Sequence, residues 1–87
     1  MRYTVVWQPS AEDDLATLWL QAPSRSEVAA AADAIDDALN RNPVSAGESR
    51  AGITRLLVVA PLAVLFDVHE ADRLVSVWAV WRWAREG

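Results

Sequence analysis

The chain contains no cysteine and no lysine, and it has only one histidine among its 87 residues. Without cysteine there is no disulfide bond and no thiolate ligand for a metal ion. A single histidine also argues against a structural zinc site, which relies on cysteine and histidine ligands. We therefore expect no metal centre and no bound cofactor.

Long apolar segments are missing as well. Asp67, Glu70, Asp72 and Arg73 interrupt the apolar C-terminal half, so no segment reaches the roughly 20 apolar residues that a transmembrane helix needs. The N-terminal sequence lacks the apolar region of a signal peptide. These absences predict a cytoplasmic protein without membrane contact. The short length predicts one domain over residues 1–87.

The charges that are present are predominantly negative. Twelve acidic residues outnumber eight arginines and give a net charge of −4. An acidic domain is a poor general binder of nucleic acid, because it repels the phosphates. Apolar residues make up 53% of the chain. That is enough for one core and for some apolar surface that a partner would cover.

The first half of the sequence predicts one strand and two helices. Residues 2–7 are rich in β-branched and aromatic side chains and predict a short strand. Ser10 is the expected N-cap of a first helix, which Pro23 ends. Ser24 begins a capping box and opens a second helix that continues to about Asn40. Because alanines on the helix faces allow a close approach, we expect the two helices to form an antiparallel hairpin.

The second half predicts a loop and then a three-stranded antiparallel meander. The loop spans residues 42–52, and the strands are expected at 53–59, 62–68 and 74–83. With the first strand and the hairpin, this order predicts an α+β fold with both helices on one face of the sheet. The other face would be left partly bare and apolar, which implies a ligand, a partner or a homodimer.

Alternation along a strand assigns its side chains to two faces. In the middle strand of the meander, one face carries Leu62, Val64, Phe66 and Val68, and the other carries Ala63, Leu65 and Asp67. In the last strand, one face carries Val75, Val77, Ala79, Trp81 and Trp83, and the other carries Leu74, Ser76, Trp78, Val80 and Arg82. We expect Trp78 to pack in the core.

This order of elements in so short a chain resembles the RelE/ParE superfamily of toxins from type II toxin–antitoxin modules. The stretches that carry the resemblance are residues 6–15, 42–43, 47–50, 62–68 and 72–81. The resemblance implies a growth-inhibiting toxin of the plasmid-stabilisation type. It also implies a cognate antitoxin that wraps an extended or helical segment across the toxin. Members are ribosome-dependent mRNA endonucleases or poisons of DNA gyrase, and others have no established activity.

RNA cleavage without a metal ion needs a group that activates the 2′-hydroxyl and cations that stabilise the charge on the phosphate. RelE-like nucleases supply these with basic residues on the sheet and in the C-terminal tail. The resemblance makes Arg55 and Arg82 the candidate catalytic residues. Ala63 stands where a basic residue is expected, and no tyrosine or histidine follows Arg82. The depleted cluster favours binding over catalysis and leaves open whether the protein is an enzyme.

The two arginines also have a simpler interpretation, which we favour. Arg55 and Arg82 would be solvent-facing strand residues or would pair with Asp67 or Glu48, since structural ion pairs perturb charges as readily as active sites do. His69 lies in an acidic turn and is interpreted as an exposed turn residue.

Trp81, Trp83 and Arg50 are the candidate partner contacts, because tryptophan and arginine are enriched among the hot spots of interfaces. Base stacking on the tryptophans would need a basic groove, which an acidic protein does not predict. The spacing of Arg50 and Glu48 equally predicts an ion pair within the loop.

Three functions are consistent with these residues. The favoured one is a toxin that acts on translation or on DNA gyrase and that its antitoxin neutralises. The alternatives are a ribosome-dependent mRNA endonuclease and a non-toxic member that serves as a protein-interaction module. Without the antitoxin, we expect a homodimer or a poorly soluble chain.

Overall fold

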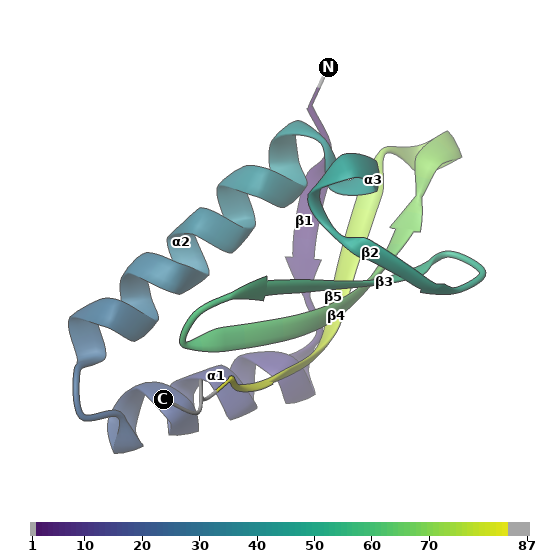
Figure 1. The fold of residues 1–87 in the computed structure, drawn as a ribbon. Helices are drawn as coiled ribbons and strands as arrows, with labels where there is room; N and C mark the ends of the chain where they lie inside the picture. The colour runs from purple at the N-terminus through teal and green to yellow at the C-terminus, as the bar shows by residue number, and fades with distance from the viewer. Residues whose placement is uncertain (1, 84–87) are drawn as a thin grey trace.

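The computed structural model describes residues 2–83, which form three α-helices, one 3₁₀ helix and five strands (Figure 1). They follow in the order β1 (Thr4–Trp7), α1 (Pro9–Gln21), α2 (Arg25–Arg41), α3 (Pro43–Ala46), β2 (Glu48–Ala51), β3 (Thr54–Val59), β4 (Leu62–His69), η1 (Glu70–Asp72) and β5 (Leu74–Arg82). Within this part of the chain, no helix combines the length and the apolar composition that crossing a membrane requires.

The five strands form one mixed sheet in the order β1-β5-β4-β3-β2. The strands β3, β4 and β5 are antiparallel neighbours, which confirms the predicted meander. The first strand lies parallel to β5, with Thr4 opposite Leu74 and Trp7 opposite Val77. Parallel neighbours need a long crossover, and part of that crossover is the helical hairpin. The predicted α+β architecture, with helices on one face of the sheet, is confirmed.

The helix starts agree with the sequence in one case and differ in the other. The N-cap of α1 is Gln8 and not Ser10, so the predicted start is wrong. Pro9 takes the first helical position instead, because its fixed φ suits a helix and its missing N–H would be unpaired there anyway. The start of α2 is confirmed, since the Ser24 hydroxyl accepts the Glu27 backbone N–H at 3.4 Å.

The segment 42–52 is not the irregular loop that the sequence predicts. It contains α3 and the edge strand β2, which pairs with β3 and sets Glu48 opposite Leu56. The strand is held by backbone pairing, and its side chains, which are all exposed, give no apolar alternation to detect. Gly52 closes the β2–β3 turn at a φ of +57°, a conformation that favours glycine.

Gly47 marks a close approach between this segment and the sheet. A Cβ added to Gly47 would lie 2.6 Å from the Leu56 carbonyl oxygen and 2.9 Å from Cζ of Phe66. No larger side chain fits without displacing one of them. The glycine therefore lets β2 join the sheet while Phe66 stays in the core.

The covered face of the sheet, on which the helices pack, carries the hydrophobic core. The four residues of β4 that alternation places together on this face are buried, and Phe66 is fully buried. The core comprises Ala11, Val28, Ala31, Ile35, Leu39, Leu62, Val64, Phe66, Val68, Val75, Val77 and Val80. The opposite side of the sheet is called the open face below.

A β-bulge changes the faces of β5 and corrects the predicted alternation. Phe66 pairs with Val77 and Leu65 pairs with Ala79, so Trp78 is an extra residue in β5. An inserted residue reverses the alternation beyond it. Val80 is consequently buried, and Trp78 is 42% exposed. The prediction that Trp78 packs in the core is wrong, as is the assignment of the residues after it.

Candidate partner-binding surfaces

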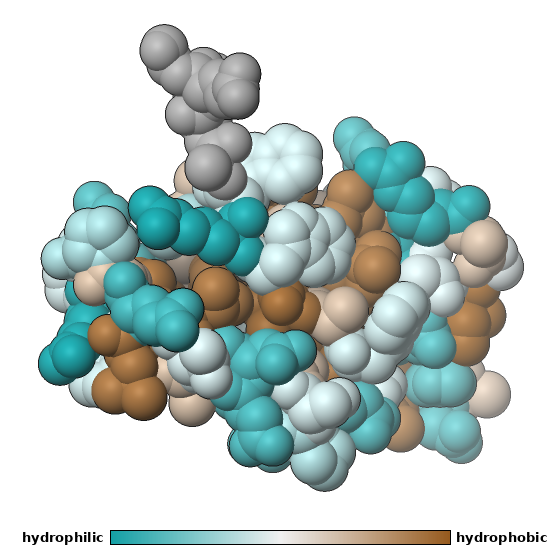
Figure 2. Space-filling view, turned by 90° about the horizontal axis from the view of Figure 1, so that it is seen from below, coloured by the Kyte–Doolittle hydropathy of each residue, from teal (hydrophilic) through white to brown (hydrophobic). Residues whose placement is uncertain are grey.

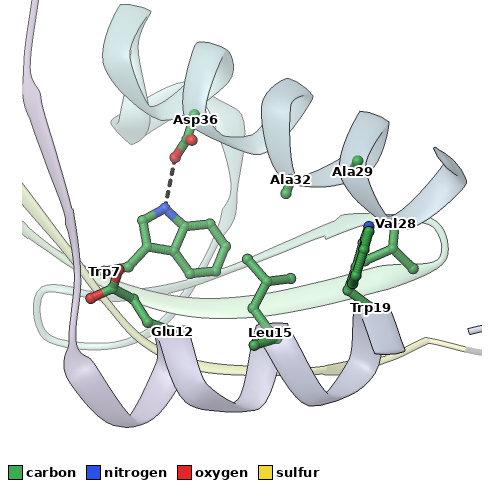
Figure 3. A pocket seen from close by; sticks show the side chains of 9 residues that line it. Trp7, Glu12, Leu15, Trp19, Val28, Ala29, Ala32 and Asp36 are labelled. Atoms are coloured by element: carbon green, nitrogen blue, oxygen red, sulfur yellow. Dashed lines mark hydrogen bonds between the residues drawn. The ribbon is translucent and has the colours of Figure 1, made fainter. Parts of the chain in front are cut away.

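A groove of about 430 Å³ lies between α1 and α2. Figure 1 shows the two helices diverging from the short turn that joins them, and Figure 3 shows the side chains between them. The lining is mainly apolar and consists of Trp7, Glu12, Leu15, Ala16, Trp19, Val28, Ala29, Ala32 and Asp36. Small alanines from α2 face two indoles from β1 and α1, so the groove is broad enough to admit another side-chain layer.

Polar contacts fix the two indoles of the groove. The Trp7 indole N–H donates to Oδ1 of Asp36 at 2.7 Å, which joins β1 to α2 (Figure 3). Trp19 is 40% exposed, and the Arg25 guanidinium lies 4.8 Å from the centre of its ring. At that distance the cation is attracted to the face of the indole. The groove is therefore an ordered apolar surface that remains open to solvent.

The rim of the groove is acidic. Glu12 and Asp36 line it directly, and Asp33 and Asp37 lie near Asp36 on the exposed side of α2. Asp37 forms a 3.0 Å ion pair with Arg41, and both side chains are largely exposed. Asp33, Asp36 and Asp37 form a solvated face of α2. Their charge favours a ligand with basic groups beside an apolar strip.

The open face of the sheet is a second exposed apolar surface. The register places on it Leu56 and Val58 of β3, Ala63 and Leu65 of β4, and Ala79 and Trp81 of β5, with Trp78 at the bulge. Trp81 is 36% exposed, whereas Ala63 is buried between Val58 and Trp81. On another side of the molecule, where α1 lies at the bottom of Figure 1, hydrophobic residues also reach the surface among hydrophilic ones (Figure 2).

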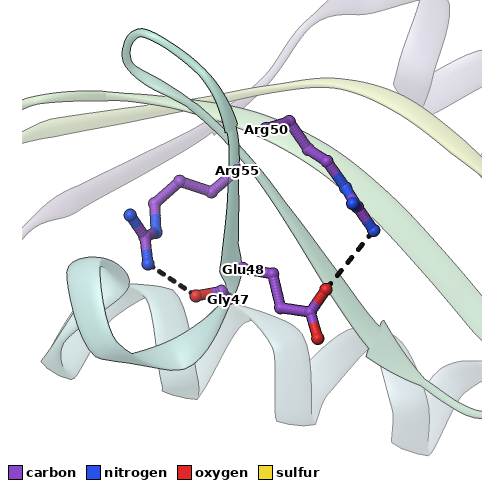
Figure 4. A network of polar contacts seen from close by, with 4 residues as sticks. All are labelled: Gly47, Glu48, Arg50 and Arg55. Carbon is purple, nitrogen blue, oxygen red and sulfur yellow. Dashed lines mark hydrogen bonds and ion pairs between the residues drawn. The ribbon is translucent and has the colours of Figure 1, made fainter.

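Arg55 lies on the covered face, opposite Phe66. Its guanidinium donates to the Gly47 carbonyl oxygen at 2.6 Å, and its buried Nε has no hydrogen-bond partner within the described residues (Figure 4). It is neither solvent-facing nor paired with Asp67 or Glu48, so the simpler interpretation is wrong for this residue. The structure shows it anchoring the chain before β2.

Arg82 lies far from Arg55 along the sheet. It is exposed and pairs with Leu62, whereas Arg55 pairs with Phe66. Four residues of β4 separate the two levels, which is about 13 Å at roughly 3.3 Å per residue. Arg82 borders the turn between α1 and α2, near Glu27 and Pro61. The two candidate catalytic residues are therefore not brought together, and their catalytic role stays a prediction.

The remaining candidates lie on the edge strand β2 or at the ends of the strands β4 and β5. Arg50 pairs with Glu48 at 3.4 Å in β2, as its spacing predicts (Figure 4). Trp83 is exposed beside the β3–β4 hairpin, and its backbone N–H donates to the Pro61 carbonyl oxygen at 2.8 Å. His69 ends β4 and is partly buried, which differs from the exposed turn position that the sequence predicts.

Residues 2–83 hold no group of three or more histidine, aspartate or glutamate side chains that is able to bind a metal ion. The sequence analysis noted that no tyrosine or histidine follows Arg82. Residues 84–87, to which this observation refers, lie outside the described residues. Sequence reasoning did not identify the helix groove. Its signals are Trp7 just before α1, Trp19 near the end of α1, and the alanines of α2.

Comparison with known proteins identifies the fold of the chain. Neither a protein-family model nor a curated protein matches this chain. The toxin–antitoxin complex RelBE2 from Mycobacterium tuberculosis is similar, with a TM-score of 0.79 and 20% identity over 94% of this chain and 92% of that chain. The archaeal RelE–RelB complex from Pyrococcus horikoshii OT3 has a TM-score of 0.71 and 16% identity over 99% and 100% of the two chains.

The chromosomal ParDE system of P. aeruginosa is also similar. Its TM-score is 0.70, with 15% identity over 95% of this chain and 98% of that chain. Similarity at these identities extends over whole chains and concerns the fold. The chain therefore has the RelE/ParE fold, as the resemblance of its sequence predicts.

Proposed function

We propose that this chain is the growth-inhibiting toxin of a toxin–antitoxin pair, that it acts in the cytoplasm, and that an antitoxin encoded beside it neutralises it by binding. The groove between α1 and α2 is the observation that carries this proposal. It exposes two ordered indoles over an apolar floor with an acidic rim. The RelBE2 structure, which has a similar fold, is a toxin–antitoxin complex, and this supports the same kind of partner here.

The groove suits an amphipathic helix of the antitoxin. Helices that bind in grooves insert apolar side chains spaced at i, i+3, i+4 and i+7. Alanines on α2 leave room for such side chains between Trp7 and Trp19. Glu12 and Asp36 then favour lysine or arginine on the flanks of the bound helix. Apolar burial would supply most of the affinity, and the charges would set the orientation.

We infer that inhibition proceeds by binding a component of translation or DNA gyrase. RNA cleavage would require several cations around one phosphate. The register of the described strands places Arg55 on the covered face and sets Arg82 about 13 Å away along the sheet. Arg50, at the edge, is paired with Glu48. This arrangement favours the binding function over the mRNA endonuclease.

The growth test is direct. Inducing the chain alone should arrest growth, and co-expressing the polypeptide encoded in the neighbouring reading frame should restore it, because the complex covers the groove. Protein synthesis and plasmid supercoiling, followed after induction, identify the target as translation or gyrase. Unaltered growth at high levels of folded protein would contradict the toxin function and favour the non-toxic interaction module.

A further inference from the structure

Two carboxylates lie on the open face of the described strands: Glu48, which is on the edge strand β2 and pairs with Arg50, and Asp67. Asp67 is on the central strand β4, and its Oδ1 accepts the Thr54 hydroxyl at 2.6 Å and the Trp78 indole N–H at 3.1 Å. These bonds come from β3 and from the bulge of β5. They fix the carboxylate beside the exposed indole. The bulge therefore presents Trp78 and Asp67 together at the surface.

This carboxylate has no internal cation. The ion pairs among residues 2–83 join Arg41 to Asp37 and Arg50 to Glu48. The arginines that lie over aromatic rings in the same range are on Trp19 and Tyr3. Neither Asp67 nor the face of Trp78 is thus occupied by a described arginine. The hydrogen bonds that the Asp67 carboxylate accepts from residues 2–83 are both to Oδ1, which leaves Oδ2 available to a ligand.

The chemistry of this surface selects a cationic ligand. A guanidinium or ammonium group at Asp67 would form a charge-assisted hydrogen bond and lie against an indole, and both interactions favour a cation. A nucleic-acid phosphate would instead be repelled by Asp67, with no basic groove to compensate. Leu65 and Leu56 adjoin the site with apolar surface, and Trp81 lies further along the same face, at the level of Ala63.

We infer that the open face of the sheet binds a basic, apolar polypeptide segment, which seats an arginine or lysine on Asp67 and across Trp78. The segment is assigned to the antitoxin, so this inference rests on the proposed function. It gives the antitoxin a second site, separate from the helix groove. The site recognises the positive charge of the segment together with its apolar neighbours.

The test is a titration of the purified full-length chain with the peptide acetyl-Leu-Arg-Leu-Arg-Leu-amide, followed by the indole N–H signals in ¹H–¹⁵N spectra. Trp78→Phe assigns the Trp78 signal. We expect the Trp78 and Trp81 signals to shift saturably. Asp67→Asn should weaken binding about tenfold, because it removes the charge while its Oδ1 still accepts from Thr54 and Trp78.

Asp14→Asn is the matched control. It removes the same charge from an exposed position of α1 that lies outside both the helix groove and the open face, and it should leave the open-face affinity unchanged. Equal binding by wild type and Asp67→Asn would overturn the site. So would equal binding of acetyl-Leu-Glu-Leu-Glu-Leu-amide, or tighter binding of hexauridylate at Trp78. Asp67-dependent peptide binding by a chain that does not arrest growth would support the site while removing the toxin function.

Discussion

Replacing Phe66 by alanine is expected to lower the free energy of unfolding by about 3–5 kcal/mol. Phe66 is fully buried on the covered face and lies opposite Val77 and Arg55 in the neighbouring strands. Its ring also fills the space against Gly47. Truncation leaves a cavity that these neighbours cannot close. A chain of this length has about 4–13 kcal/mol of stability in total, so the loss is a large part of it.

Urea unfolding followed by circular dichroism measures this effect, and Ile53→Ala provides the control. Ile53 is 50% exposed in the turn before β3. Its truncation should cost about 1 kcal/mol or less. Equal losses for the two variants would show that Phe66 is not the centre of the core.

Ala29→Arg is expected to weaken binding of the antitoxin by about 100-fold or more. Ala29 lies in the wall of the groove on α2, facing the side where Trp19 and Leu15 project (Figure 3). An arginine there fills the space that a bound helix needs and repels the basic flank that Asp36 favours. Losses of this size are typical of the hot-spot region of an interface. Co-purification and a measured Kd report the result.

Ala34→Arg is the matched control for this substitution. Ala34 is also an exposed alanine of α2, and it does not line the groove. Arginine and alanine are both good helix formers, so α2 should persist in the two variants. We expect Ala34→Arg to bind the antitoxin like wild type. Equal weakening by both substitutions would mean that charge on α2 matters and that the groove does not.

Much of the fold could be predicted because its signals are local. Alternation correctly grouped Leu62, Val64, Phe66 and Val68 on one face of β4, which the structure shows to be the covered one, and Ser24 identified the start of α2. The strand β2 was missed because backbone pairing holds it without an apolar pattern. The bulge at Trp78 was missed because it depends on the register between β4 and β5, which one strand's sequence does not reveal.

The candidate sites were harder to predict than the fold. The groove arises only when β1 and the two helices come together, since Trp7 is 29 residues away from the Asp36 that it contacts. The sequence suggested that Arg55 is a catalytic residue or a solvent-facing cation. In the structure, its guanidinium instead donates a hydrogen bond to the Gly47 carbonyl oxygen. Residue type alone did not show these partners. The role of a charged or aromatic side chain depended on tertiary contacts.

Coverage of the helix groove is tested most directly by hydroxyl-radical footprinting of the free chain and of its complex with the neighbouring-frame polypeptide. Trp19 lines the groove and is 40% exposed, and the adjacent Leu20 is 60% exposed outside it. We expect the oxidation rate of Trp19 to fall severalfold in the complex while that of Leu20 stays the same. An unchanged rate at Trp19 in a formed complex would contradict the assignment of the groove to the antitoxin.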